Sequence, residues 1–269
     1  VEKLLAQFEE AEEYAADEDG GETEPDNKSV LSALLTTDKD ADDPVIGNRL
    51  GAYRIEAEIG RGGMGTVYLA VRDDQEFNRK VAVKLVKRGM DTDYILRRFR
   101  QERQILATLE HPFIAGLLDG GTSPDGRPYF VMELVEGRTL YDYCDQNRLN
   151  LRERLRLFLK IAESVAFAHQ NFVIHRDLKP NNILVTRNET GAARLCILDF
   201  GLARFSEHEL AESVTIPGTV MGTPGYMPPE QMRGERADER SDLFAVGVMI
   251  YQSLRGEKPF AGKTYKEIT

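Results

Sequence analysis

The chain has 269 residues, 45 acidic and 35 basic side chains, and a formal net charge of −10. Its 41% hydrophobic content is enough for a core. Its longest apolar run, Leu243 to Ile250, is far shorter than the about 20 residues of a membrane-spanning helix, so no span is expected within this chain. Residues 1–16 lack the basic start of a secretory signal. The two cysteines exclude a disulfide scaffold and favour a reducing, cytoplasmic compartment.

Charge is distributed unevenly along the chain. Residues 1–46 hold fifteen acidic residues and three lysines, a net charge of −12, whereas the remainder holds 30 acidic and 32 basic residues. We expect residues 1–46 to be an acidic, largely disordered segment, because residues 17–29 are too polar to bury a core. The rest is nearly neutral, so its charge gives no reason to expect nucleic acid as a partner.

The first ordered pattern is a pair of strands around a glycine-rich turn. Residues 53–59 alternate as a strand does, residues 60–65 (GRGGMG) interrupt them, and residues 66–71 resume the alternation. Such a hairpin lets the backbone approach a phosphate, although an ordinary flexible hairpin has the same pattern. It is not a dinucleotide fingerprint, because there the glycines lead into a helix, whereas a β-branched strand follows here.

A lysine and a glutamate then occupy positions that predict burial. Residues 81–86 (VAVKLV) form an apolar strand with Lys84 in its middle, and a buried lysine is costly unless it meets an anion. Residues 93–109 have helical periodicity, with Glu102 on the apolar stripe. Lys84 and Glu102 are therefore expected to pair, the alternative being two unrelated side chains that each reach solvent.

The second half carries a dense polar cluster. After an amphipathic helix over residues 151–169, residues 174–185 (IHRDLKPNNILV) run from polar residues straight into an apolar strand. A further strand over residues 195–198 is closed by Asp199-Phe200-Gly201. An aspartate and an asparagine can hold a hard divalent cation, a second aspartate can accept a proton from a hydroxyl, and a lysine can neutralise a transferred phosphoryl group.

With these motifs in order, the sequence resembles the eukaryotic-type serine/threonine protein kinases, in a style close to their bacterial branch. The resemblance begins at Tyr53 and rests on GRGGMGTV (60–67), VAVK (81–84), HRDLKPNN (175–182), DFG (199–201) and GTPGYMPPE (222–230). It implies an α+β, bilobal fold. An N-lobe and hinge over residues 47–135 hold a five-stranded antiparallel sheet and one helix, and a mainly helical C-lobe over 136–269 stops before its end.

The resemblance also implies a role for each matching residue. Asp177 is the catalytic base, Lys179 contacts the γ-phosphate, Lys84 holds the α- and β-phosphates, and Glu102 orients Lys84. Asn182 and Asp199 bind Mg²⁺ or Mn²⁺, with ATP as co-substrate. The remaining ATP-binding positions are Gly60, Gly62, Gly65, Val67, Ala82, Met132, Glu133, Val135 and Leu184.

The acceptor and the regulation follow from the same resemblance. Lys179 and Thr223 favour Ser/Thr hydroxyls of proteins, with Thr223 as part of the substrate platform. Arg176 can receive a phosphate, which suggests activation by phosphorylation of Thr215 or Thr219, by another copy of the kinase. A constitutively ordered loop is the alternative. Pro228, where the family usually has alanine, is a departure that we expect to be tolerated.

The end of the chain determines the competing interpretations. The pattern of residues 241–254 predicts an apolar, buried helix with Ser241 as a plausible N-cap. The family resemblance implies that Asp242 braces the backbone at residues 175–176 and that Glu230 has a structural role. We expect a membrane anchor, if there is one, only beyond residue 269. One alternative to an active kinase is an ATP-binding pseudokinase or scaffold, but the sequence keeps all of the residues that pseudokinases usually lose in part: Lys84, Glu102, Asp177, Asn182 and Asp199. The other alternative is a fragment that truncation has inactivated.

Overall fold

The computed structural model describes residues 45–62, 65–74, 79–87, 104, 106, 108–187, 193–200, 224–233 and 235–260, all within one unit, Asp42–Thr269. The acidic segment up to residue 44 therefore lies outside the described residues. So do Glu102, Thr215, Thr219 and Thr223, which carry four of the expected roles. In the part that is described, no helix is long and apolar enough to cross a membrane.

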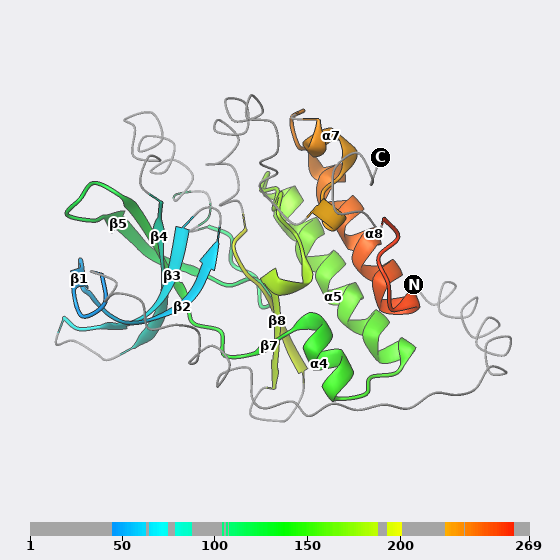
Figure 1. Cartoon of the computed structure of the whole chain (residues 1–269), viewed down its shortest axis with the longest axis horizontal. Coiled ribbons are helices and arrows are strands. Elements are labelled where there is room, and N and C mark those ends of the chain that lie inside the picture. The colour runs from blue at the N-terminus through cyan, green and yellow to red at the C-terminus, as the bar shows by residue number, and fades with distance from the viewer. Residues whose placement is uncertain are drawn as a thin grey trace, which may run out of the picture. The chain divides into compact units, whose positions relative to one another are not determined.

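One antiparallel sheet of six strands makes up the N-terminal part of this unit (Figure 1). Its strand order is β1-β2-β3-β4-β6-β5. The strands are β1 (Arg49–Leu50), β2 (Tyr53–Gly62), β3 (Gly65–Arg72), β4 (Lys80–Val86), β5 (Leu117–Thr122) and β6 (Pro128–Glu133). The two-residue β1 is added to the five strands expected from the sequence. One face of the sheet has its own apolar cluster, in which Ile55, Ala70, Val83 and Val131 are almost fully buried.

The glycine-rich turn differs from its sequence-based description. Instead of interrupting the hairpin, the glycines continue it: Gly60 lies opposite Val67, and Gly62 lies opposite Gly65. Glycine has no side chain that needs a packing partner, so it can extend a strand beyond the sheet's core. Register shifts between Ile55 and Ala57 and between Glu58 and Gly60 mark where the regular ladder is distorted before this extension.

After β6, the residues that the structure describes are mainly helical, apart from a small sheet of order β7-β8-β9. Its helices are α4 (Leu140–Gln146), α5 (Leu151–Gln170), α7 (Pro229–Met232) and α8 (Glu239–Arg255), with 3-10 turns η1 (Pro180–Asn182) and η3 (Pro224–Tyr226). The small sheet consists of β7 (Arg138–Thr139), β8 (Ile183–Arg187) and β9 (Ala193–Ile197). Helices α5 and α8 pack side by side in Figure 1, and both contribute to one large apolar core.

Helix α5 has a defined signal at each end. At its start Asn150 accepts a hydrogen bond from the Glu153 backbone, and Glu153 caps the Asn150 backbone in return. At its end the Phe172 and Val173 amides bond back to the carbonyls of residues 169 and 168. This pair of bonds is a Schellman motif, which turns the chain towards residues 174–177. It requires a left-handed residue, and Phe172 adopts φ 61° although glycine is usual there.

Helix α8 begins earlier than its sequence pattern suggested. Its N-cap is Asp238, whose side chain accepts a hydrogen bond from the Arg240 amide, so the expectation of Ser241 as N-cap was wrong. Ser241 lies in the first turn and is buried, and its hydroxyl donates to Glu230 Oε1 at 2.9 Å. Aspartate and serine cap helices about equally well. Because the Ser241 hydroxyl is engaged with Glu230, the cap is Asp238, three residues upstream. The helix buries its inner face but leaves Leu243 58% exposed.

Candidate active site

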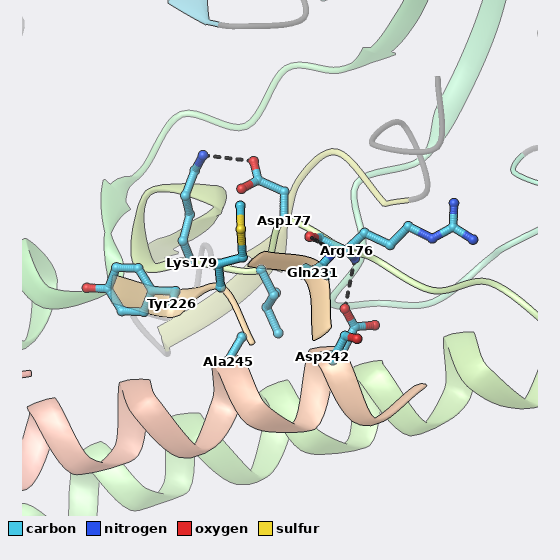
Figure 2. A pocket seen from close by; sticks show the side chains of 10 residues that line it. Arg176, Asp177, Lys179, Tyr226, Gln231, Asp242 and Ala245 are labelled. Carbon is cyan, nitrogen blue, oxygen red and sulfur yellow. Dashed lines mark hydrogen bonds and ion pairs between the residues drawn. The ribbon is translucent and has the colours of Figure 1, made fainter. Parts of the chain in front are cut away.

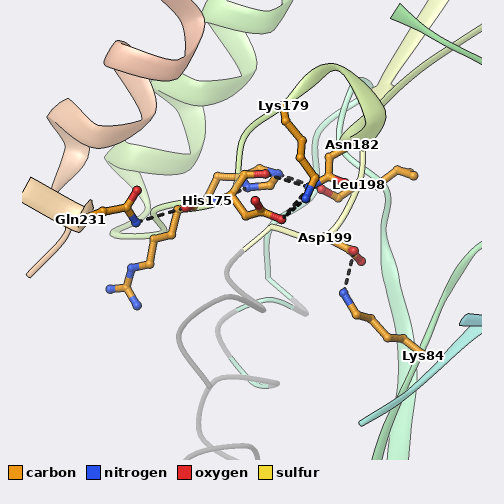
Figure 3. Close-up of polar contacts among 9 residues, drawn as sticks. Lys84, His175, Lys179, Asn182, Leu198, Asp199 and Gln231 are labelled. Carbon is orange, nitrogen blue, oxygen red and sulfur yellow. Dashed lines mark hydrogen bonds and ion pairs between the residues drawn. The ribbon is translucent and has the colours of Figure 1, made fainter. Parts of the chain in front are cut away.

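Lys84 projects from β4 into a site where it meets an anion, as a buried lysine must. Every residue of β4 except Lys80 is buried, and Lys84 is only 8% exposed. Its Nζ lies 2.6 Å from Asp199 Oδ2, which follows β9 (Figure 3). The expected partner Glu102 lies outside the described residues, so that pairing stays a prediction. The observed ion pair joins the large sheet to the segment that ends the small one.

The segment between α5 and β8 gathers three polar side chains. Lys179 Nζ lies 2.8 Å from Asp177 Oδ2. The Asn182 amide donates to the backbone carbonyl of Asp177 at 2.7 Å and, more weakly, to its Oδ2 at 3.3 Å. The 3-10 turn η1 brings Asn182 back over the loop, because the backbone N–H of Asn182 donates a hydrogen bond to the Lys179 carbonyl. The Asp177 carboxylate is therefore held between an ammonium and an amide, on a loop closed by its own hydrogen bonds.

Two buried residues hold this loop from behind. The Asp242 carboxylate, 1% exposed, accepts the backbone amides of His175 and Arg176, each at 2.8 Å. The His175 ring accepts the Asp177 amide at Nδ1 and contacts the Leu198 carbonyl through Nε2 at 2.9 Å. With Nδ1 as the acceptor, Nε2 is the ring nitrogen that donates to the Leu198 carbonyl. The carboxylate-bearing loop thus rests on α8 on one side and on the residues after β9 on the other.

Backbone strain marks the same two segments. Arg176, next to Asp177, has φ 68°, and Asp199 has φ 59°. Both are non-glycine residues in the left-handed region, which costs about 1–3 kcal/mol and persists only where the surroundings fix it. At Arg176 the fixing contacts are its amide bond to Asp242 and its carbonyl bond from Gln231 Nε2 at 3.1 Å.

Asn182 and Asp199 have the chemistry of a divalent-cation site. The Asn182 Nδ2 is engaged with the Asp177 carbonyl, which leaves Oδ1 as the atom available to a ligand. Asp199 contributes a carboxylate whose side chain is 25% exposed. Nowhere in the described ranges do three or more His, Cys, Asp or Glu residues group as metal ligands. Two oxygen donors suit Mg²⁺, which completes its coordination with water and phosphate oxygens.

The glycines of the β2–β3 hairpin fall into two kinds. A Cβ on Gly60 or Gly62 would meet no atom within 4 Å, so the fold itself leaves room for a side chain there. A Cβ on Gly65 would lie 2.1 Å from the Leu85 carbonyl oxygen of β4, and Gly65 also has φ 157°. Only Gly65 is required by the chain's own packing. The contacts of the described residues do not by themselves require glycine at Gly60 or Gly62.

The other expected ATP-binding positions lie around these groups. Ala82 pairs with Met132 across β4 and β6, and Val67 pairs with Lys84 across β3 and β4. Leu184 lies on β8, opposite Cys196 of β9. Val135 follows β6 in the segment that leads to β7. The contacts of these residues with ATP stay predictions.

Three residues that the sequence analysis did not assign to the site take part in its support. Arg194 Nη2 lies 3.2 Å from Glu133 Oε1, at the end of β6. His169 Nε2 lies 2.8 Å from Asp242 Oδ2. Gln231 donates to the Arg176 carbonyl as described above. Each pair is separated by more than fifty positions along the chain, so no local pattern in the sequence could have indicated it.

Comparison with known proteins decides the family. The family described as "Protein kinase domain" matches residues 53–269. This chain belongs to the protein kinase family. It is 40% identical over 214 residues to "Serine/threonine-protein kinase pkn2" of Myxococcus xanthus, 38% identical to "PrkC" of Bacillus subtilis and 41% identical to "PknA" of Mycobacterium tuberculosis. These alignments cover about 80% of the chain: 79%, 82% and 79% respectively. The family uses ATP as co-substrate together with a divalent metal.

Solved structures agree on the kinase fold. The "Mycobacterium tuberculosis PknI kinase domain" superposes with a TM-score of 0.60 and 26% identity, and the match covers 79% of this chain and 78% of that one. The chain spans only 25%, 33% and 48% of the three curated relatives named above. These relatives are thus considerably longer proteins that contain a kinase domain similar to this one.

Proposed function

We propose that this protein is a serine/threonine protein kinase that transfers the γ-phosphoryl group of ATP to hydroxyls of proteins. The carrying observation is the Asp177 carboxylate, which lies 2.8 Å from the Lys179 ammonium on a loop braced by Asp242. A polar cluster of this kind could serve several reactions if it stood alone. Together with the Lys84–Asp199 ion pair and a glycine hairpin that has open space at Gly60, it supplies the groups that phosphoryl transfer needs.

The proposed reaction uses the chain's residues as follows. The substrate hydroxyl oxygen attacks the γ-phosphorus, the bond from that phosphorus to the bridging oxygen breaks, and ADP leaves. Asp177 accepts the hydroxyl proton. The Lys179 ammonium, 2.8 Å from that carboxylate, places positive charge where the transferred group accumulates negative charge. Lys84 holds the α- and β-phosphates, exchanging its present contact with Asp199 for phosphate oxygens.

Mg²⁺ or Mn²⁺ is the metal we propose, held by Asn182 and Asp199. When bound, a divalent cation would neutralise phosphate charge during transfer. The chain's part is to present two oxygen donors on fixed backbone: Asp199 is constrained at φ 59°, and the Asn182 carbonyl oxygen is oriented by the bond from Nδ2 to Asp177. Both ligands stand at the ends of the β8–β9 hairpin, with the Leu198 amide bonded to the Asn182 carbonyl at 2.8 Å.

Ser/Thr acceptors and regulation by phosphorylation also belong to the proposal. The relatives are named as serine/threonine kinases, and Lys179 takes the position that such kinases use beside the acceptor. We further propose protein substrates that include a second copy of this chain, with Thr215 or Thr219 as phosphorylated residues. In the same proposal, the loop around Arg176 receives the phosphate.

Mass spectrometry on the whole chain incubated with ATP and MgCl₂ tests this function. We expect phosphate on the parent chain and on added casein, and none with Asp177→Asn. Asp145→Asn is the matched control, because it makes the same chemical change at a 66% exposed carboxylate that pairs with Arg154. Phosphotransfer by Asp177→Asn at the parent rate would contradict the assignment of the base. ATP binding without transfer by the parent would favour a nucleotide-binding scaffold.

A further inference from the structure

Lys258 lies against η3, the short turn that lines one pocket together with Asp177 and Lys179. It follows α8 and reaches back to η3, where its Nζ lies 4.5 Å from the centre of the Tyr226 ring. A Cβ on Gly225 would lie 2.8 Å from Lys258 Cδ and 3.1 Å from its Nζ, so the lysine stem is in contact with the Gly225 backbone. Tyr226 in turn lines the pocket that contains Asp177 and Lys179 (Figure 2).

The position of Lys258 is fixed by its neighbours. Phe260, two residues later, stacks on Phe244 of α8 with ring centroids 5.6 Å apart and an interplanar angle of 11°. The Tyr226 ring is itself held, because its hydroxyl donates to Gln252 Oε1 at 2.6 Å. The lysine therefore spans two anchored points, and its ammonium cannot move far from the ring without giving up the cation–π contact.

The ammonium of Lys258 has no acidic partner among the described residues. Within the described part of the chain, its side chain lies against the ring of Tyr226 and the backbone of Gly225. Asp177 is paired with Lys179, Glu230 accepts from Ser241, and Glu257, adjacent to Lys258 in the sequence, is exposed. A half-buried ammonium that faces an aromatic ring keeps hydrogen-bond donors for an anion.

We propose that Lys258 selects substrates in which an acidic residue lies within about three positions of the phosphorylated Ser or Thr. This inference rests on the proposed kinase function and names the substrate class of its site. The acceptor hydroxyl must reach Asp177, and a strand advances about 3.3 Å per residue. Because Tyr226 lines the same pocket as Asp177 and carries Lys258 on its ring, we place the substrate carboxylate there, where it gains a charge-assisted hydrogen bond.

Acceptors of this class occur in the chain itself. Thr23 stands between Glu22 and Glu24, and Thr37 is followed by Asp38, within a segment whose net charge is −12. These sequences supply natural test peptides whose acidic residues can be replaced one at a time. A segment with the opposite charge to Lys258 is also steered towards it over distances of about 10 Å at moderate ionic strength.

The test compares glutamate with glutamine at each position from −3 to +3 around a single threonine, in peptides that are otherwise identical. The measured quantity is the ratio of kcat/KM for the Glu peptide over the Gln peptide, which cancels any general change in activity. We expect a ratio of about 3 to 10 at one or more positions for the parent chain, and below about 2 for Lys258→Gln. Lys258→Arg should keep the preference, because it keeps the charge.

Arg255→Gln is the matched control. It removes one positive charge from the exposed last turn of α8, three residues before Lys258. Its ratio should equal that of the parent. A parent ratio near 1 at every position would overturn the proposal, and so would a preference that survives in Lys258→Gln or disappears equally in Arg255→Gln.

A binding measurement separates this inference from the proposed function. Fluorescein-labelled peptides with alanine in place of threonine are titrated with the whole chain, and anisotropy gives the dissociation constants. If the chain transfers no phosphate, the kinase function fails, but the Glu-to-Gln ratio of binding constants still decides the role of Lys258. A lysine-dependent ratio of about 3 to 10 would support the docking site, and equal constants would refute it.

Discussion

Replacing Asp242 should destabilise the chain strongly, and the size of the effect follows from the contacts. The carboxylate is 1% exposed and accepts two backbone amides, those of His175 and Arg176, each at 2.8 Å. Asp242→Ala leaves both donors buried without an acceptor, at about 1–3 kcal/mol each. Removing a buried charge returns part of that cost. We therefore expect the free energy of unfolding to fall by about 2–4 kcal/mol.

Asp242→Asn should lower the free energy of unfolding by less than Asp242→Ala does. Its single carbonyl oxygen can satisfy one of the two amides, while its NH₂ group faces the other donor, so a loss of about 1–3 kcal/mol is expected. Activity should fall further than the folded fraction, since the backbone on either side of Arg176 then loses a fixed contact. Urea unfolding followed by circular dichroism gives the stability, and a peptide assay at low urea gives the activity.

Ser241→Ala is the control for these variants. It lies next to Asp242 in the same helical turn and loses one hydrogen bond, to Glu230, for about 0.5–1.5 kcal/mol. A free energy of unfolding within about 0.5 kcal/mol of the parent for Asp242→Ala, with unchanged kcat, would refute the reasoning. Such a result would mean that water or a backbone rearrangement satisfies both amides.

Three further predictions concern separate parts of the chain. Gly65→Ala should lower the urea midpoint of unfolding, because the new Cβ would clash with the Leu85 carbonyl oxygen of β4. Gly60→Ala is the control and should keep the parent midpoint, because a Cβ there meets open space. Equal midpoints for the two variants would contradict this prediction. Burial raises the pKa of Cys144 to about 11 and that of Cys196 to about 12. Neither thiol should therefore react with Ellman's reagent at pH 8 until urea unfolds the chain. A fast reaction of the folded chain would disprove this prediction. Phe172→Gly should raise the free energy of unfolding by roughly 0.5–1 kcal/mol, because glycine adopts φ 61° without strain and the 92% exposed Phe172 side chain gives up little packing. A lower urea midpoint for the variant would argue against relief of strain.

Much of the arrangement followed from local patterns. Helix α5 covers the range expected from its periodicity plus one residue, and β4 carries Lys84 buried as the strand pattern required. The apolar strand that ends before Asp199 was also expected. These features depend on the alternation and helical spacing of neighbouring residues, which a sequence displays directly.

Contacts between distant residues could not be predicted in this way. A buried lysine indicates that some anion must be near, but not which one, and Asp199 is 115 positions from Lys84. The N-cap of α8 was misplaced because Ser241 and Asp238 are both good capping residues, and only the packing of Ser241 against Glu230 decides between them. The role of Gly65 likewise depends on how β4 lies beside it.

The separation of 115 residues between Lys84 and Asp199 has a consequence for synthesis. The strands around Lys84 pair with near neighbours and can form while the chain is still being made. At about 5–20 residues per second, the ribosome needs roughly 6–23 s more to add Asp199. During that interval Asp199, the partner of Lys84 in the folded chain, has not yet been made. We therefore expect the Lys84–Asp199 ion pair, which joins the large sheet to the segment after β9, to form only after residue 199 has left the exit tunnel.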